Sequence, residues 1–125
     1  MHFVRIYTDS AGETHFEDVT LPSSRRESPV SSALTEVSEA LPVADAFFRR
    51  VLRDHPETPH PAPHAQLVVH LAGEAEVEVS DGEVRRFGPG SVVLVEDLSG
   101  KGHLTRRIGS IPRETLMIPL VEGER

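Results

Sequence analysis

The chain has no cysteine and no tryptophan, and it carries one tyrosine and five phenylalanines in 125 residues. Without cysteine, disulfides, thiolate zinc sites and cysteine nucleophiles are excluded, and the redox compartment stays undecided. No apolar run approaches the length of a transmembrane helix. The N-terminus also lacks the basic and then apolar segments of a secretory signal. These absences predict a cytoplasmic protein with no membrane partner.

An excess of positive charge is also absent. Lysine and arginine number 13 against 20 aspartates and glutamates, which gives a formal net charge of −7. This balance argues against binding to nucleic acids or to anionic membranes. Arginine doublets stand at positions 25–26, 49–50, 85–86 and 106–107. Because they are scattered, they predict solvated strand faces or turn edges rather than one basic stripe, and we expect no nucleic-acid partner.

The composition that remains is that of an ordinary soluble protein, with 38% hydrophobic and 26% charged residues. A chain of this length can bury a core of its own without disulfides or structural metals. We therefore expect residues 1–125 to form a single domain.

Short alternating runs separated by glycine and proline turns dominate the sequence. Residues 75–80 read Ala-Glu-Val-Glu-Val-Ser, which is a period-two strand pattern, and Asp81-Gly82 is a two-residue hairpin signal. Prolines at four positions require 54–63 to be extended or turning. Further strands are expected at 4–8, 14–21, 46–52, 67–72, 83–87, 91–95, 103–108 and 114–121. Roughly nine or ten short strands predict an all-β sandwich or barrel.

The N-terminal third is less regular. Residues 3–21 are expected to form a hairpin, and the polar stretch 22–32 a long loop. Residues 31–40 fit either a short helix or a strand, and periodicity does not separate the two. The motif-bearing core of the barrel is expected at about 44–121.

Histidines and a glutamine stand at the starts of several expected strands. In a small barrel, His60, Gln66 and His103 would meet at one mouth, with Gly100-Lys-Gly102 allowing the tight turn before His103. Imidazole and amide oxygen ligands on three strands suit a divalent transition metal such as Zn, Fe, Mn or Ni. Taken singly, a loop histidine needs no ligand, and only the joint spacing of the three predicts a metal site.

Strand parity adds candidates for proton transfer. If Gln66 faces the interior, His70 does as well, either as a hydrogen-bonded core histidine or as a site residue that takes up a proton near pH 7. Glu96 and Asp97 follow a buried strand and could anchor arginines, cap a turn or act as acid and base. Because adjacent strand residues point to opposite faces, at most one of the two can enter a pocket. His70 and Glu96 are the catalytic candidates.

The spacing resembles the paired motifs of the cupin superfamily. Its first motif reads G-x5-H-x-H, then three or four residues, then E-x6-G, and its second reads G-x5-P-x-G-x2-H-x3-N. The chain has His60-x-Ala62-x3-Gln66-x6-Gly73, then a Pro-Gly turn, and then Gly100-x2-His103. The resemblance covers about residues 54–107 and implies a jelly-roll β-barrel, a metal held by His60, Gln66 and His103, and a homodimer.

Four positions depart from the family pattern. Asp54 replaces the leading glycine, Ala62 the second histidine, Gln66 the acidic ligand and Arg107 the asparagine. His64 and His70 are the candidates for a fourth ligand, although no motif position supports either. The homodimer could pair through the N-terminal hairpin.

Two classes of function follow from the resemblance. The first is a metal-dependent enzyme that acts on a small oxygenated organic molecule by isomerase, lyase, cyclase or dioxygenase chemistry. The second is a non-catalytic module that binds or senses a small ligand and has lost its metal, as the alanine at position 62 suggests. A degenerate barrel kept for dimerisation is a third reading, because this architecture hosts unrelated functions.

Overall fold

The strand signals of the sequence form eleven β-strands in the computed structural model, which describes residues 1–53 and 58–121. The strands are β1 (His2–Thr8), β2 (Thr14–Thr20), β3 (Ser23–Glu27), β4 (Leu34–Ser38), β5 (Phe47–Arg50), β6 (Gln66–Ala72), β7 (Glu74–Val79), β8 (Val84–Phe87), β9 (Val92–Val95), β10 (His103–Ile108) and β11 (Glu114–Pro119). The expected all-β class is confirmed. Within the described ranges, no helix has the length and apolarity needed to span a membrane.

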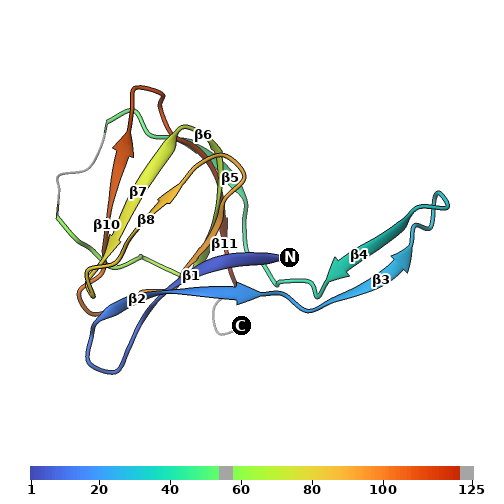
Figure 1. The fold of residues 1–125 in the computed structure, drawn as a ribbon, viewed down its shortest axis with the longest axis horizontal. Helices are drawn as coiled ribbons and strands as arrows, with labels where there is room; N and C mark the ends of the chain where they lie inside the picture. The colour runs from blue at the N-terminus through green and yellow to red at the C-terminus, as the bar shows by residue number, and fades with distance from the viewer. Residues whose placement is uncertain (54–57, 122–125) are drawn as a thin grey trace.

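The strands form three sheets (Figure 1). The largest has six strands in the order β2-β1-β9-β6-β11-β5, the second has the order β10-β7-β8, and the third is the β3–β4 hairpin. Of the pairings in these sheets, β1 with β9 is parallel and the others are antiparallel. The pairings do not close the described strands into one barrel, so the structure establishes the all-β class without the finer jelly-roll assignment.

The core lies between the six-stranded and three-stranded sheets. Side chains of one face of each sheet meet in a single buried cluster, which includes Ile6, Val68, Val77, Val93 and Met117. Alternation along the strands accounts for this arrangement, because successive side chains point to opposite faces. In β6 the buried positions alternate from the first residue onward, which confirms the expected inward parity of its residues 66, 68 and 70.

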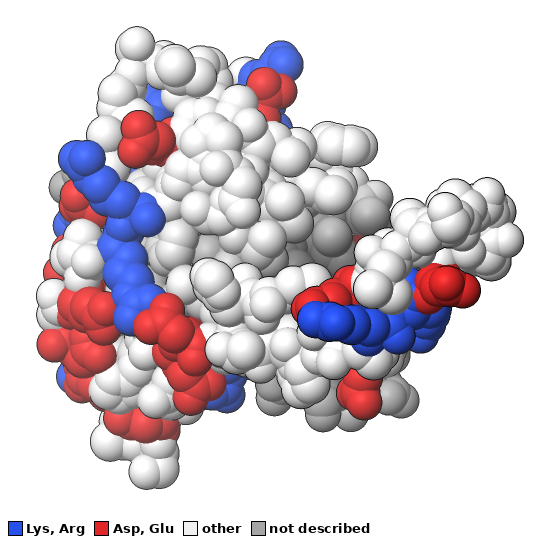
Figure 2. Space-filling model, turned by 45° about the vertical axis from the view of Figure 1, so that its right-hand side comes forward, with Lys and Arg blue, Asp and Glu red and all other residues white. Residues whose placement is uncertain are grey.

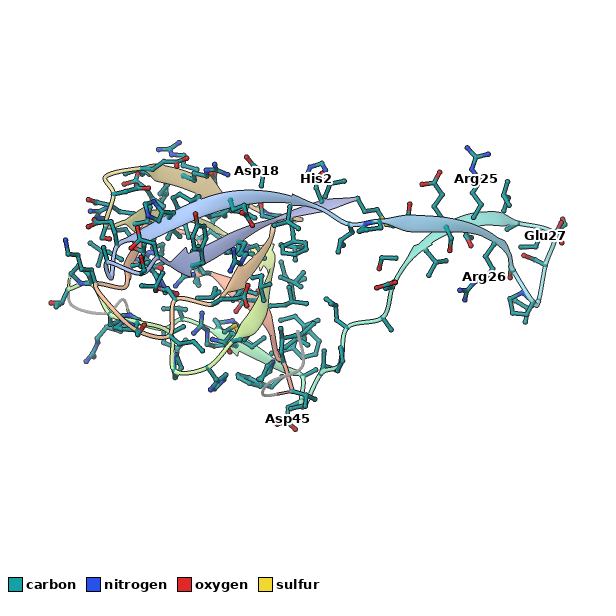
Figure 3. All side chains as sticks on the ribbon, turned by 90° about the horizontal axis from the view of Figure 1, so that it is seen from below. His2, Asp18, Arg25, Arg26, Glu27 and Asp45 are labelled. Atoms are coloured by element: carbon teal, nitrogen blue, oxygen red, sulfur yellow. The ribbon has the colours of Figure 1, made fainter. Side chains whose placement is uncertain are left out.

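The expected loop over 22–32 is wrong in its first half, and so is the helical reading of 31–40. Residues 23–27 and 34–38 are strands β3 and β4, which pair with each other and with no other described strand. They form an arm that projects from the body (Figures 1 and 3). All five residues of β3 are exposed, so the arm has no buried face to impose an alternating apolar pattern. The polar sequence of β3 therefore gave no strand signal, whereas β4 falls within 31–40, where a strand was one of the two alternatives.

The arginine doublets are tied to neighbouring carboxylates. Arg106 bonds Glu76 and Glu78 across the β7–β10 pair, at 3.0 and 2.6 Å. Arg85 bonds Asp18 at 2.8 Å, and the other two doublets each contribute one ion pair as well. On the face drawn in Figure 2, basic side chains lie beside acidic ones on both the body and the arm. This matches the expectation of solvated strand faces.

Candidate metal centre

His60 and His103 are brought together by a backbone bridge. Each residue donates its N–H to the other's carbonyl, at 3.0 and 3.1 Å, so an isolated antiparallel bridge joins the proline-rich segment to the start of β10. Gly102 makes this approach possible. Its φ is +73°, and a Cβ on it would overlap the carbonyl group of His60. Only glycine fits both the conformation and the space.

The two imidazoles and the Gln66 side chain line the same cavity, which has a volume of about 470 Å³. The ring centroids of His60 and His103 are 5.5 Å apart. Two imidazoles on one tetrahedral ion have centres about 5 Å apart, because each ligating nitrogen lies about 2.1 Å from the metal. Gln66 is buried at the start of β6, on the inward face. The structure therefore places the three predicted ligands around one space.

Asp97 fixes the orientation of the His103 ring. Its side chain is fully buried, and Oδ2 lies 2.6 Å from Nδ1 of His103. An ionised carboxylate can only accept, so Nδ1 of His103 donates and the lone pair of a neutral ring is left on Nε2. The carbonyl of Asp97 also accepts the N–H of Ala62 at 2.9 Å, which ties the histidine segment to the same support.

His60 is oriented in a similar way. Its Nδ1 donates to the carbonyl of Pro61, at 3.1 Å, because a carbonyl oxygen can only accept. Metal-binding histidines usually donate their second ring N–H to a carboxylate or a backbone carbonyl. His60 and His103 thus both show the supporting hydrogen bond expected of imidazoles that bind a metal through Nε2.

His70 lies further along the cavity. It is 4% exposed, its Nδ1 donates to the carbonyl of Ser91 at 3.2 Å, and its ring stacks on Phe87 with centroids 5.8 Å apart. Burial lowers the pKa of His70, and the nearby charges of Arg113 and Arg49 lower it further, against the opposing effect of the Ser91 hydrogen bond. The ring is therefore neutral near pH 7.

The position of His70 also bears on the predicted fourth ligand. His70 lies four residue steps after Gln66, which corresponds to about 13 Å along β6. One metal ion cannot bind side chains at both positions, so His70 suits proton transfer better than ligation. His64 is exposed and does not line this cavity.

Glu96 is not part of the cavity wall in the described chain. Its Oε1 accepts from Nε of Arg5 at 2.6 Å, which joins the end of β9 to β1. Of the roles open to this residue, anchoring an arginine is the one the structure shows. Asp97 instead faces the opposite way and contacts His103, as alternation along a strand requires.

The departure at Ala62 has a structural counterpart. This residue is 6% exposed and packs in the hydrophobic core cluster, so a methyl group stands where the cupin motif has its second histidine. Within residues 1–53 and 58–121, no three histidine, aspartate or glutamate side chains gather closely enough to hold a metal. Among the described residues, the Gln66 amide is the remaining predicted ligand on the cavity wall. Asp54, at the first position of that motif, lies outside the described residues.

Three contributors to this site were not predicted from the sequence. Asp97 was a candidate acid, not the support of His103, although it ends a buried strand only six residues earlier. Arg49 and Arg113 also line the cavity. Nothing in the sequence distinguishes these two arginines from the other charged residues at strand ends.

The comparisons with known proteins supply no relative. No protein-family model matches the chain, and a search of curated proteins finds no match. The site is therefore defined by its own geometry: two supported imidazoles and a buried amide at one end of a cavity that also contains a neutral histidine and two arginines.

Proposed function

We propose that the chain is a small cupin-like enzyme that binds a divalent transition metal through His60, Gln66 and His103. The observation that carries this proposal is the His60–His103 bridge, which brings two imidazoles to one cavity wall, each with a hydrogen bond at Nδ1. Two imidazoles and one amide oxygen form a neutral donor set, which suits Zn or a neighbouring first-row metal with water at the open positions.

A jelly-roll architecture is part of the same proposal. Strands distant in the sequence pair side by side, as in β1 with β9 and β7 with β10. Two sheets of unequal size share one core, which is the arrangement from which a jelly roll is built. The resemblance of the sequence motifs to those of cupins points to the same fold.

The cavity favours chemistry on a small oxygenated organic molecule of the isomerase, lyase, cyclase or dioxygenase type. A bound metal supplies a Lewis acid that polarises a carbonyl or enol oxygen. His70 is the group placed to accept a proton, because its ring is neutral and its Nδ1 is already a donor, which leaves the lone pair on Nε2. Val68, Val93 and Met117 give the wall an apolar surface against which the carbon skeleton of such a molecule would pack.

A non-catalytic module that binds a small ligand without metal is the second candidate. The buried methyl group of Ala62 favours it, because a site with one imidazole fewer than the motif holds metal more weakly. The two candidate functions predict different effects of a metal chelator on the protein. A binding module keeps its ligand in the presence of chelator, whereas the proposed enzyme loses activity.

The decisive experiment is metal analysis of the purified protein. We expect wild type to retain close to one divalent ion per chain, and His60→Ala and His103→Ala each to lose most of it. His15→Ala is the matched control, because this histidine lies away from the cavity and should leave the metal content unchanged. Equal metal content in all four proteins would contradict the proposal.

We also propose that a second copy of the chain is a partner, through the β3–β4 arm. An isolated two-stranded hairpin is only marginally stable in water, and the arm exposes Val30 and Leu34 by 91% and 63%. A partner subunit that covers the arm would bury both side chains. Light scattering should give a dimer for wild type and a monomer after deletion of residues 23–38. A monomeric wild type would contradict this pairing.

A further inference from the structure

Two arginines stand among the described residues of the cavity wall, although the protein as a whole is acidic. The chain has a net charge of −7, yet the described residues that line the cavity include two arginines and no aspartate or glutamate. Asp97 is close by but lies behind His103, outside the lining. Arginine side chains on a cavity wall favour an anionic ligand.

The two arginines lie at the end of the cavity where His70 lies. Arg49 on β5 pairs with Thr115 on β11, and Thr115 pairs in turn with His70 on β6, so the three residues lie in register across neighbouring strands. Arg113 is two residues before Thr115. Gln66, in contrast, pairs with Pro119 at the other end of β11. The arginines and the predicted metal ligands thus mark opposite ends of one space.

Arg113 is held there by a close backbone contact. Gly73 has a φ of +73°, and a Cβ on it would lie 2.9 Å from the carbonyl oxygen of Pro112 and 3.1 Å from Cα of Arg113. The N–H of Val51 donates to the carbonyl of Arg113 at 3.0 Å. Arg113 is only 6% exposed and lines the cavity, so its side chain is part of the wall rather than extended into solvent. Such preorganisation strengthens recognition of a planar anion.

We propose that Arg113, assisted by Arg49, binds the carboxylate of the substrate at the end of the cavity opposite His60 and His103. This inference rests on the proposed function and names its substrate class: a small carboxylic acid that carries a carbonyl or hydroxyl group a few bonds from the acid. A carboxylate matches the bidentate geometry of a guanidinium. The oxygen function of the same molecule then lies toward the metal ligands, with His70 between the two ends.

The test measures binding of 4-oxopentanoate and of its uncharged methyl ester by calorimetry. Both ligands are titrated into the full-length protein with a chelator present and again with added Zn²⁺. The variants are Arg113→Met and Arg49→Met, which keep much of the apolar stem. Arg50→Met is the matched control, because Arg50 neighbours Arg49 but bonds Glu114 at 3.1 Å and does not line the cavity.

We expect the ester to bind at least about 10-fold more weakly than the acid, and Arg113→Met to weaken binding of the acid by about 10- to 100-fold, since hydrogen bonds to charged groups contribute about 1.5–3 kcal/mol. Arg49→Met should have a smaller effect and Arg50→Met none. If Arg113→Met does not fold, a selective loss in Arg49→Met with the ester result supports the inference.

The two metal conditions separate this inference from the proposed function. Acid binding that depends on the arginines in chelator, together with a failure to bind Zn²⁺, would support the carboxylate site and refute the metal proposal. Equal binding of acid and ester, no binding of the acid by wild type, or unchanged affinity in both arginine variants would overturn the carboxylate site.

Discussion

His103 and His15 both bond aspartates, but they differ in how many of their ring nitrogens contact a carboxylate. His103 contacts one carboxylate, that of Asp97, through Nδ1 at 2.6 Å. His15 lies between two carboxylates, with Nε2 at 2.6 Å from Asp9 and Nδ1 at 2.7 Å from Asp81. The first arrangement leaves a ring nitrogen for a ligand, and the second leaves none.

The electrostatic consequence differs as well. The hydrogen bond to Asp9, followed by the one to Asp81, raises the pKa of His15 above its ordinary value. A charged imidazolium that donates to two strand ends is a structural clasp between the β1–β2 turn and the β7–β8 turn. The number of ring nitrogens bonded to carboxylates thus distinguishes His103, a candidate metal ligand, from His15, which links two turns of the structure.

The largest effect is expected from Gly102→Ala, which attacks the bridge that places His60 beside His103. An added Cβ would overlap the His60 carbonyl, and the residue would remain at a positive φ. We expect a loss of about 3 kcal/mol or more in the free energy of unfolding, with loss of metal uptake. Chemical denaturation and metal analysis measure the two effects.

Gly82→Ala is the matched control for that substitution. Gly82 has a φ of +100° but no atom within 4 Å of an added Cβ. Gly82→Ala should lower the free energy of unfolding by only about 1–2 kcal/mol, because alanine is strained at a positive φ. It should leave metal binding intact. Equal effects of the two substitutions would show that the contact with His60 is unimportant.

A smaller effect is expected from Asp97→Asn, which keeps the shape of the support of His103 and removes its charge. Loss of such a partner typically lowers metal affinity about 10- to 100-fold, and competition with a chromophoric chelator measures it. Asp81→Asn makes the same change beside His15 and should leave the affinity unchanged. If both variants bind metal like wild type, Asp97 does not support a ligand.

The smallest effect is the pH dependence of the His15 clasp. Because the pKa of His15 is raised in the folded state, its contribution to stability is fully present below its ordinary pKa of about 6.5 and is lost as pH rises through the folded value. The melting temperature of wild type should therefore exceed that of His15→Gln at pH 6 and converge with it at higher pH. A difference that grows with pH would contradict the clasp.

How far the sequence could predict this molecule depended on burial. In β6 and β7 one face is buried, so alternation revealed both strands and the inward parity of Gln66 and His70. The arm buries no face of β3, and that strand therefore had no periodic pattern. Spacing alone was enough to group His60 with Gln66 and His103, because tight glycine turns fix where the strands begin.

The supporting contacts of the site were not predictable in the same way. Asp97 reaches His103, and Arg113 reaches the cavity, only through the packing of segments joined by irregular turns. The alternation of apolar and polar residues along a strand does not predict such contacts. Glu96 is a conspicuous acidic residue at the end of β9, yet it bonds Arg5 on the neighbouring strand β1 and does not enter the cavity.

The measurement that tests the central claim most directly is a crystal structure of protein loaded with Zn²⁺, with anomalous data collected at the zinc edge. The account predicts one strong peak within about 2.0–2.3 Å of Nε2 of His60, Nε2 of His103 and the side-chain oxygen of Gln66. A map without a peak among these three side chains, or with zinc held elsewhere on the chain, would contradict it.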